Sequence, residues 1–337
     1  MRQTSFLLLI FLANPTPLWA TPPEPSPSAL PTALTIDEPI QPIPIPEPPD
    51  ARRQTIIALG ARLFADPRLS SNDTTACITC HSLSRGGADK ERYSRRPLGD
   101  LTSVNTPTIF NLPLNFRLFW NGRVRNLEEQ IRADPFRDAD THWAQVLGKL
   151  KRDAAYSKEF AALYPDGLTI ANIQDTIVAF EESLITPNSR FDRYLRGEKT
   201  AISEREAQGY ALFKSYGCTA CHQGANVGGN LFQRFGVMGD YFADRGQLTE
   251  ADAGRYNVTK REVDRHAFRV PSLRLVTLTA PYFHDGSAPT LQKAIKVMAK
   301  YQLGRPISDA HIELIIDFLK TLPGEYQGRL LVPENYP

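Results

Sequence analysis

The sequence predicts an all-α protein made of two domains of similar design, and three observations support this. Apolar side chains recur every three or four residues in several segments, as they do along one face of a helix. No segment alternates between apolar and polar residues as a half-buried strand would. A five-residue pattern, C-x-x-C-H, occurs at residues 77–81 and again at residues 218–222, which indicates an internal duplication. A chain of 337 residues is long enough for two such domains.

Prolines and a capping residue set the ends of the predicted helices in the first half. One helix has its apolar stripe over residues 56–64 and ends before Pro67, because proline disfavours helical geometry in the residue before it. A second helix is preceded by Thr169, a favourable N-cap, and ends before Pro187. Its apolar face is formed by Ile170, Ile173, Ile177, Phe180 and Leu184.

Capping residues also predict three helices in the second half. Ser203 and Glu206 form a capping box that opens a helix running to Cys218. Thr290 and Ser308 open the last two helices. Their apolar faces comprise Leu291, Ala294, Ile295 and Met298 in the first, and Ile312, Ile315, Ile316 and Leu319 in the second.

The first fifty residues predict export rather than a further domain. Residues 1–20 contain one basic residue, an apolar run and Ala20 at their end, as a cleaved secretory signal does; an uncleaved N-terminal anchor is the alternative. Residues 21–50 are dominated by proline, which lacks a backbone donor and favours an extended tether; a disordered leader with no role is the alternative. The net charge of +2 does not indicate a nucleic-acid-binding surface.

The expected domains are residues 51–190 and residues 191–322, followed by a tail at 323–337. The boundary falls in a polar stretch interrupted by Pro187 and Gly197. Each predicted domain therefore contains one C-x-x-C-H unit.

The two C-x-x-C-H units predict two covalently attached c-type haems. Two thiols at this spacing form thioethers with the two vinyl groups of one porphyrin, and the adjacent histidine ligates the iron. The attachment residues would be Cys77, Cys80 and His81 for the first haem, and Cys218, Cys221 and His222 for the second. One alternative is a four-cysteine zinc site, although zinc-binding pairs normally lie closer together in the sequence. Disulfides, common in exported proteins, are the other.

The ligand on the far side of each iron determines what a haem protein can do. Thioether ligation suits electron transfer, whereas an open position permits peroxide chemistry. Apart from the leader, the sequence has two methionines, Met238 and Met298. Met298 lies on the apolar face of a predicted helix, where core packing is the ordinary role, and Met238 lies in a loop between glycines. The residues alone leave both open as iron ligands.

Beyond these patterns, five segments resemble the bacterial diheme cytochrome c peroxidase family, which also contains methylamine-utilisation diheme enzymes that oxidise another protein. The segments are CITCHSLSRGGAD, VNTPTIFNLPLNFRLFWNGRVRNLEEQ, SLITPNSRFDRYLRGE, GCTACHQGANVGGNLFQRFG and FRVPSLRLVTLTAPYFHDGSAPTLQKAIKVMAKYQLG. The resemblance covers roughly residues 52–325, which is nearly the whole chain after its leader.

The resemblance implies four residues with roles at the haems. Met298 would be the axial ligand of the second haem, and Trp120 would lie between the two haems and relay electrons. Gln130 would lie beside the peroxide site. His284 would lie near the haem-to-haem contact in a hydrogen-bonding role. From the residues alone, Trp120 as a core tryptophan and Gln130 as a solvated helical residue remain alternatives.

The resemblance also implies a calcium site. Asn105 and the backbone carbonyls of Thr279 and Pro281 would be its ligands, and calcium prefers oxygen ligands of this kind. The alternative is that Asn105 caps a turn before Pro107.

Two positions depart from the family pattern. Many members have a histidine that blocks the first iron until the other haem is reduced, whereas this sequence has Pro97, which offers no side-chain ligand. The first haem is therefore expected to be open to peroxide without reductive activation. The acid–base glutamate of the family is also missing, and Asp138 or Asp140 would take its place, with His142 as a further candidate.

These expectations describe a periplasmic cytochrome c peroxidase that reduces hydrogen peroxide to water. Electrons would come from a small donor protein, a c-type cytochrome or a cupredoxin, through the C-terminal haem, and the family resemblance suggests a homodimer. One alternative is a diheme oxidase that modifies a Trp or Tyr of a partner protein. Met298 disfavours it, because such relatives place a tyrosine there. Another is a non-enzymatic electron carrier, in which His142 would close the first iron.

Overall fold

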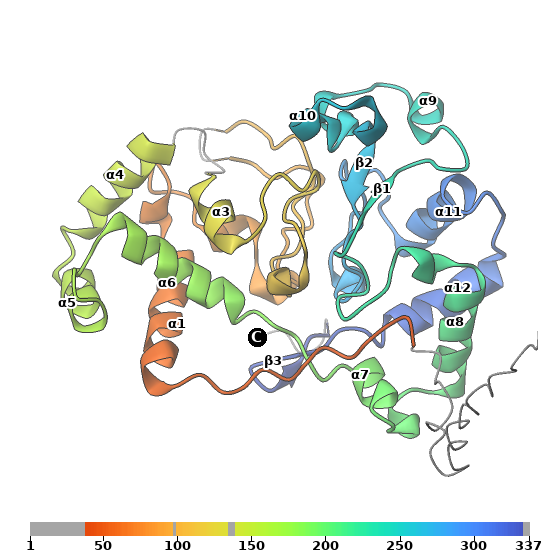
Figure 1. Ribbon diagram of the computed structural model, residues 1–337, viewed down its shortest axis with the longest axis horizontal. Coiled ribbons are helices and arrows are strands. Elements are labelled where there is room, and N and C mark those ends of the chain that lie inside the picture. Colours follow the sequence, from red (N-terminus) through yellow and green to blue (C-terminus); the bar gives the residue numbers. More distant parts are fainter. Residues whose placement is uncertain (1–37, 97–98, 134–138, 333–337) are drawn as a thin grey trace, which may run out of the picture. The chain divides into compact units, whose positions relative to one another are not determined.

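The computed structural model describes residues 38–96, 99–133 and 139–332, and the part from Pro39 onward belongs to one compact unit (Figure 1). The helices of the first half are α1 (Ala51–Phe64), α2 (Cys77–Cys80), α3 (Leu127–Arg132), α4 (Ala139–Leu150), α5 (Ala154–Leu163) and α6 (Ile170–Glu182). Those of the second half are α7 (Arg190–Leu195), α8 (Glu204–Ser215), α9 (Tyr241–Arg245), α10 (Tyr256–Thr259), α11 (Leu291–Tyr301) and α12 (Asp309–Leu319). Strand β1 (Phe232–Arg234) pairs antiparallel with β2 (Ala267–Arg269), and β3 (Glu325–Tyr326) pairs with β4 (Arg329–Leu330). Helices dominate the described chain, so the predicted all-α class is confirmed.

The N-terminal ends of four helices lie where the sequence predicts them. The side chains of Thr169, Thr290 and Ser308 each accept a hydrogen bond from a backbone amide in the first turn of α6, α11 and α12. Ser203 and Glu206 form the capping box of α8. These four predicted boundaries are confirmed, because capping is a local interaction that the sequence carries by itself.

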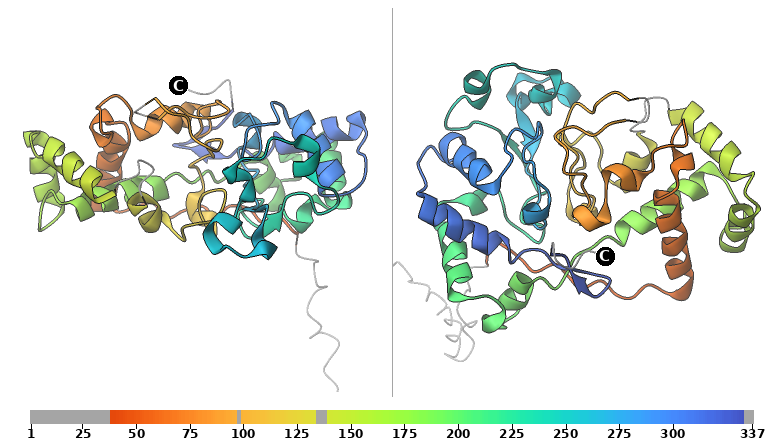
Figure 2. Two further views of the ribbon diagram at one scale, coloured as in Figure 1. Left: turned by 90° about the horizontal axis from the view of Figure 1, so that it is seen from above. Right: turned by 180° about the vertical axis from the view of Figure 1, so that it is seen from behind.

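Two helix pairs cross in the same way, α1 with α6 and α8 with α12, and each pair stays side by side in the views of Figure 2. Gly60 of α1 lies against α6, and Gly209 of α8 lies against α12. A Cβ atom on Gly60 would overlap the carbonyl oxygen of Thr176, and one on Gly209 would overlap that of Leu314. Helix backbones approach this closely only where one of them has no side chain, because protein interiors are close-packed.

The same two crossings share an aromatic contact. Four residues after each glycine, a phenylalanine ring meets a phenylalanine of the partner helix. The centroids of Phe64 and Phe180 are 5.2 Å apart, and those of Phe213 and Phe318 are also 5.2 Å apart. Helices α1 and α6 therefore correspond to α8 and α12, and the duplication indicated by the sequence extends to the packing of its helices.

Apolar clusters join the two halves. One cluster is built from α1 and α3 to α6, and a second from α7, α8 and α12. A third combines Phe64 and Phe180 of the first half with Leu275 and Leu278 of the second, together with Leu331. Because the third cluster draws on both halves, residues from Pro39 onward behave as one unit. The division into haem domains at residue 190 stays a prediction.

The end of the proline-rich segment is extended, as expected, but it is not a free tether. Ile40 and Ile43 are fully buried, and Ile40 belongs to the cluster around Phe191. The backbone oxygen of Gln41 accepts a hydrogen bond from Arg274 Nη2 at 2.8 Å. The predicted signal peptide and most of the linker lie outside the described residues. In the part of the chain that is described, no helix has the length and apolar character needed to cross a bilayer.

The crossings lead to a stability prediction. We expect Gly60→Ala and Gly209→Ala each to lower the free energy of unfolding by roughly 1–3 kcal/mol or more, because the added methyl group has no space against the partner backbone. Denaturant unfolding followed by far-UV circular dichroism measures the change.

Gly148→Ala is the matched control, because a Cβ at this helical glycine of α4 meets nothing within 4 Å. It should be neutral or stabilise by roughly 0.4–1 kcal/mol. If all three substitutions change the free energy of unfolding equally, close backbone contact at the two helix crossings is not what requires Gly60 and Gly209.

Candidate functional site

The first C-x-x-C-H unit folds so that its histidine is oriented. Cys77–Cys80 form the short helix α2, and His81 directly follows it. The Nδ1 atom of His81 lies 3.1 Å from the carbonyl oxygen of Gly87, to which it donates its proton. Nε2 then carries the free lone pair, as an iron ligand requires. Burial lowers the pKa of His81, and the hydrogen bond to Gly87 only partly opposes this, so the ring is held in its neutral, ligating form.

The second unit repeats this arrangement. Cys218–Ala220 form a 3₁₀ turn, and Nδ1 of His222 lies 3.4 Å from the carbonyl oxygen of Val227. Burial lowers the pKa of His222 to about 4, with the backbones of Val227 and Pro271 opposing the shift. Both histidines are therefore partly buried, neutral and held through Nδ1, a combination that fits haem iron ligation.

The cysteines show no sign of the alternative uses. All four are free thiols, and the described residues bring together no group of three or more His, Cys, Asp or Glu side chains around a common point. The four-cysteine zinc site and the disulfides are therefore not formed. Burial raises the pKa of Cys77 to about 12 and that of Cys218 to about 11. Thiols with such raised pKa values are not activated for catalytic or redox chemistry. Thioether attachment of haem stays the prediction that the C-x-x-C-H spacing carries.

Each histidine is backed by a second loop of the same design. In the first half, Thr108 Oγ1 donates to the carbonyl oxygen of Gly86 at 2.6 Å, just before the Gly87 carbonyl that holds His81. In the second half, Ser272 Oγ donates to the carbonyl oxygen of Asn226 at 2.8 Å, just before the Val227 carbonyl that holds His222. Segments 105–108 and 269–272 are therefore equivalent in the two halves.

Two further loops are equivalent, and they meet at the junction of the halves. In each, an antiparallel bridge closes a seven-residue loop, one from Leu118 to Val124 and one from Tyr282 to Ala288. The second residue of each is a phenylalanine with positive φ, 64° at Phe119 and 73° at Phe283. Sequence analysis did not detect this repeat, although LFWNGRV and YFHDGSA align without a gap.

The third residue of each loop lies against its counterpart. Trp120 and His284 meet edge to face, with ring centroids 6.5 Å apart. The indole Nε1 of Trp120 donates to the carbonyl oxygen of Asn105 at 2.9 Å. Asn105 N in turn donates to the carbonyl oxygen of His284 at 2.7 Å, and Arg269 N donates to that of Trp120 at 2.9 Å. Trp120 is thus held at the junction from both sides, and this placement supports the relay role implied by the family.

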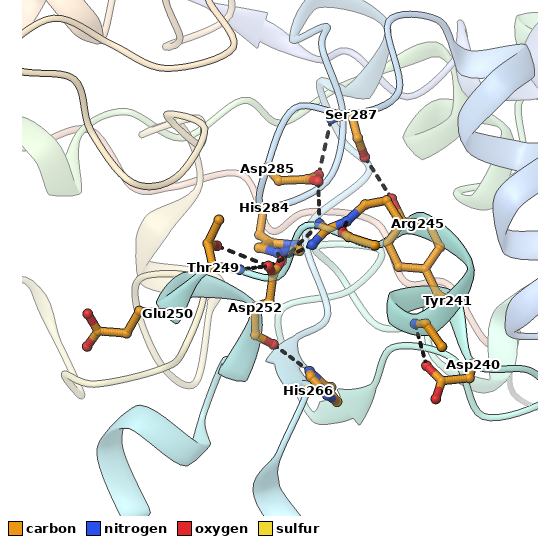
Figure 3. Close-up of polar contacts among 12 residues, drawn as sticks. Asp240, Tyr241, Arg245, Thr249, Glu250, Asp252, His266, His284, Asp285 and Ser287 are labelled. Carbon is orange, nitrogen blue, oxygen red and sulfur yellow. Dashed lines mark hydrogen bonds and ion pairs between the residues drawn. The ribbon is translucent and has the colours of Figure 1, made fainter.

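A buried ion network fixes the other face of His284 (Figure 3). Nε2 of His284 lies 2.7 Å from Oδ1 of Asp252. Arg245 donates to both carboxylate oxygens of Asp252, at 2.9 and 2.6 Å, and to Asp285 at 2.7 Å. Burial alone would raise the pKa of Asp252, but hydrogen bonds from His284, Arg245 and Thr249 outweigh it and hold the pKa well below its usual range. His284 therefore has the hydrogen-bonding role that the sequence suggests.

The two candidate methionine ligands have different environments. Met298, on α11, is partly buried and packs against the apolar cluster that Trp120 and Phe283 also contact. Met238 is 61% exposed in the loop before α9. A thioether at the protein surface does not fit a buried iron, so the structure supports Met298 over Met238.

The predicted distal residues are only partly described. Gln130 lies on α3, in the first half. Pro97 and Asp138 lie outside the described residues, and so does the side chain of Asp140. His142 is buried on α4 and meets the ring of its neighbour Trp143 edge to face. The choice between the two aspartates therefore stays a prediction.

Unpaired buried atoms indicate where a polar group belongs. Four buried side-chain atoms have no hydrogen-bond partner among the described residues, and all four lie in the first half: Asn121 Oδ1, Gln130 Oε1, Trp143 Nε1 and Glu181 Oε2. Native proteins normally satisfy such atoms with water or a ligand. Gln130 in particular fits a place beside a bound polar substrate.

Glu181 is a buried acid that sequence analysis missed. The equivalence of Phe180 with Phe318 places Glu181 where the second half has the buried Leu319. Burial raises the pKa of Glu181 to about 8, and its charge is close enough to act on the thiol of Cys77. The first half therefore carries a protonated acid beside its predicted haem, where the second half carries a hydrocarbon.

The residues proposed for calcium have oxygens available. The Nδ2 atom of Asn105 donates to the carbonyl oxygen of Glu91 at 2.8 Å, which leaves its Oδ1 to face another group. Within the described part of the chain, Asn105 Oδ1 and the carbonyl oxygens of Thr279 and Pro281 accept no hydrogen bond. The hydrogen bond from Asn105 N to His284 brings Asn105 next to the segment that contains Pro281.

Comparison with known proteins agrees with this geometry. A family model described as di-haem cytochrome c peroxidase matches residues 54–200, which include the first C-x-x-C-H unit. Cytochrome c551 peroxidase of Nitrosomonas europaea is 39% identical over 310 residues, 90% of each chain. The chain belongs to the di-haem cytochrome c peroxidase family.

Two further similarities show how far the likeness to this family extends. Cytochrome c peroxidase Ccp of Escherichia coli K12 is 41% identical over 293 residues, 86% of this chain but 62% of that one, so the chain spans about three fifths of that relative's length. A crystal structure of a MauG-like protein associated with microbial copper homeostasis matches with a TM-score of 0.73 and 28% identity, over 85% of this chain and 93% of that one. Relatives at 36–41% identity are named cytochrome c peroxidase or cytochrome c551 peroxidase.

Breaking the Asp252 network is expected to cost stability. Asp252→Asn leaves His284 without a carboxylate and leaves Arg245 with Asp285 alone, and removing one member of a buried ion pair typically costs about 3–5 kcal/mol. Because the pKa of Asp252 is depressed in the folded state, its contribution is complete above the unfolded pKa, near 3.8, and is lost as pH falls further. The difference in the free energy of unfolding between wild type and Asp252→Asn, measured by denaturant unfolding, should therefore become smaller below about pH 4.

Glu250→Gln, in the same 3₁₀ turn but exposed, is the control and should change stability by less than about 0.5 kcal/mol. If Asp252→Asn lowers the free energy of unfolding no more than the control does, the stabilising role given to the ion pairs of Asp252 is wrong.

Glu181→Leu tests the buried acid by installing the residue of the other half. In the folded protein the carboxyl titrates at about pH 8, whereas in the unfolded chain it ionises near pH 4.5. As pH rises from about 4.5 to about 8, ionisation of Glu181 in the unfolded chain therefore lowers the free energy of unfolding of the wild type. We expect the variant to be more stable than wild type by roughly 3 kcal/mol at pH 7, and by little below pH 4.

Denaturant unfolding across this pH range measures the difference. Glu182→Gln, which removes the neighbouring exposed carboxylate that pairs with Arg53, should follow the wild-type profile within about 0.5 kcal/mol. A difference between Glu181→Leu and wild type that does not vary with pH would show that the acid is not buried as described.

Proposed function

We propose that the protein is a diheme cytochrome c peroxidase, which reduces hydrogen peroxide to two water molecules with two electrons and two protons. The electrons come from a small redox protein, a c-type cytochrome or a cupredoxin. The observation that carries the proposal is the repeated pair of oriented, partly buried histidines, His81 and His222. Each directly follows a C-x-x-C unit, and each is held through Nδ1 by a backbone carbonyl. Bound haem supplies the one-electron chemistry that these side chains lack.

Attachment of the two haems is assigned to the thiols of the two units. Cys77 and Cys80 would hold the first haem, with His81 as its iron ligand. The second haem would be held by the corresponding residues Cys218, Cys221 and His222. All four thiols are free and partly buried, which supports this assignment.

The second half is proposed to receive the electrons. Met298 would complete the ligands of its iron, and its place in the cluster with Trp120 supports this. Trp120, fixed by its hydrogen bond to Asn105 and by the bond from Arg269 to its carbonyl, would relay electrons across the junction. A fixed indole suits this role, because a relay has to keep its distances to both partners.

The first half is proposed to bind peroxide. Gln130 would face the peroxide with its unpaired carbonyl oxygen. Asp138 or Asp140 would move the proton from one peroxide oxygen to the other, which is the general acid–base step of peroxide cleavage. With Pro97 in place of a histidine, no side chain of that loop would need to leave before peroxide enters.

Further elements of the proposal concern calcium, location and assembly. Asn105, Thr279 and Pro281 would bind one calcium ion through oxygen, which their available oxygens support. The N-terminal signal would direct the protein to the periplasm, where a small electron donor could reach it. A homodimer is proposed from the family resemblance.

A protein-modifying oxidase remains the second candidate, because a MauG-like protein shares the fold over 85% of this chain. In this case the oxidised enzyme would take electrons from a Trp or Tyr of a partner protein. Met298 favours the peroxidase, because thioether ligation suits a haem that receives electrons from a carrier.

The test uses the oxidised, haem-loaded protein without reductant. Its EPR spectrum should show one high-spin and one low-spin haem, and a stoichiometric amount of hydrogen peroxide should change the Soret band within the mixing time. Addition of a reduced small cytochrome or cupredoxin should then return the spectrum to rest, with two donors oxidised per peroxide. Two low-spin haems and no reaction would contradict an open first site. A peroxide reaction whose product neither donor can reduce would favour the protein-modifying oxidase.

A further inference from the structure

The first observation concerns Arg269, a buried arginine of β2. Its side chain is 4% exposed. Nε donates to the carbonyl oxygen of Phe119 at 3.3 Å, and Nη1 donates to Oδ1 of Asn115 at 3.2 Å. Both acceptors are neutral and both distances are long for such bonds. Within the described part of the chain, Nη2 has no acceptor and the guanidinium has no carboxylate partner.

Another buried arginine of the chain shows what full compensation requires. Arg274 is completely buried, and Nη1 pairs with Asp192 at 2.8 Å. Nε and Nη2 donate to the carbonyl oxygens of Ala225 and Gln41 at 2.6 and 2.8 Å. Arg274 thus has a carboxylate and two short carbonyl contacts, whereas Arg269 has two long neutral contacts and no counter-charge.

An uncompensated guanidinium in this position is costly. Moving an unpaired charge out of water is unfavourable by several kcal/mol, so buried charges are normally paired. Burial, with no opposing contact, lowers the pKa of Arg269 to about 10. The protein nevertheless places an arginine here, which indicates that an anion belongs beside it.

The duplication of the fold locates that anion. Arg269 and Asn105 occupy equivalent positions, because each lies two residues before the proline of its histidine-backing loop, Pro271 and Pro107. Each also donates its backbone amide to a carbonyl of the other half's junction loop, at Trp120 and at His284. The guanidinium therefore lies at the junction, beside the loop that backs His222.

A haem carboxylate is the anion that fits these constraints. The site is buried, so bulk anions have no access, and the described side chains supply no carboxylate to it. Each covalently attached haem carries two propionates, and the histidine-backing loops adjoin both predicted haems. Arginine suits such a partner, because its planar fork of donors matches a carboxylate.

We propose that Arg269 binds a haem propionate at the junction of the two halves and raises the reduction potential of that haem. The proposal rests on the two covalent haems of the proposed function. Arg269 acts as a positioning residue: its guanidinium neutralises the propionate, which would otherwise stabilise the ferric iron. Its backbone amide meanwhile holds Trp120, so one residue sets both the charge beside the haem and the place of the relay.

The experiment is a spectroelectrochemical titration of both haems in the full-length, haem-loaded protein. We expect Arg269→Gln to lower the potential of one haem. At the potential where that haem is half reduced in wild type, its ferrous-to-ferric ratio should fall about tenfold, which corresponds to 59 mV for a one-electron couple. Arg269→Lys keeps the charge but loses the fork, so the same ratio should fall about two- to threefold.

Arg234→Gln is the matched control, because Arg234 lies on the paired strand β1 but is exposed. It should leave both potentials unchanged. Unchanged potentials of both haems in Arg269→Gln would overturn the proposal. If Arg269→Gln does not retain two haems, Arg269→Lys is used instead, and unchanged potentials of both haems in that variant would likewise overturn the proposal. The haem that responds identifies whose propionate is bound.

Failure of the proposed function would be recognised separately. A pyridine haemochrome assay of wild type that finds fewer than two haems per chain would refute the covalent haem assignment itself. Two haems with no peroxide turnover would refute the peroxidase but leave the titration valid. Two haems, peroxide turnover and potentials that do not respond to Arg269 would refute this inference alone.

Discussion

The arrangement of the protein depends on a pair of exchanged backbone hydrogen bonds. Asn105 of the first half binds the carbonyl of His284 in the second, and Arg269 of the second half binds the carbonyl of Trp120 in the first. Backbone amides and carbonyls buried at such a junction must find partners, so the two loops hold each other in one register. This exchange brings the rings of Trp120 and His284 together and places each histidine-backing loop beside the other half, so the proposed relay and the proposed role of Arg269 depend on it.

The equivalence of the halves makes their differences informative. Many equivalent positions carry the same residue, but three carry unlike ones: Trp120 is opposite His284, Asn105 opposite Arg269 and Glu181 opposite Leu319. Ring packing, a fixed positive charge and a buried acid are thereby divided between two similar frameworks. The proposed function, in which one haem receives electrons and the other reduces peroxide, would need such asymmetry, because two identical haem environments would give two identical potentials.

Buried charge explains how the junction keeps one geometry. The carboxylate of Asp252 pairs with Arg245 and His284, and that of Asp192 pairs with Arg274. Each pair stabilises one particular arrangement of its side chains. Removing one member leaves its partner unpaired in a low-dielectric interior, which makes alternative packings costly. His284 is consequently held on one side by its backbone bond at the junction and on the other by the carboxylate. Its ring has little freedom to move away from Trp120.

Features that depend on near neighbours in the chain can be predicted from the sequence. The two C-x-x-C-H units, the caps at Thr169 and Ser308 and the helical class are all local, because a cap or a thioether pair involves residues within a few positions. Tertiary structure alone decided which distant residues meet. Neither the pairing of Trp120 with His284 nor the missing carboxylate at Arg269 is visible in the sequence, because both depend on side chains more than a hundred residues apart. The choice between Asp138 and Asp140 depends on the conformation of one loop, for which the sequence contains no strong local signal.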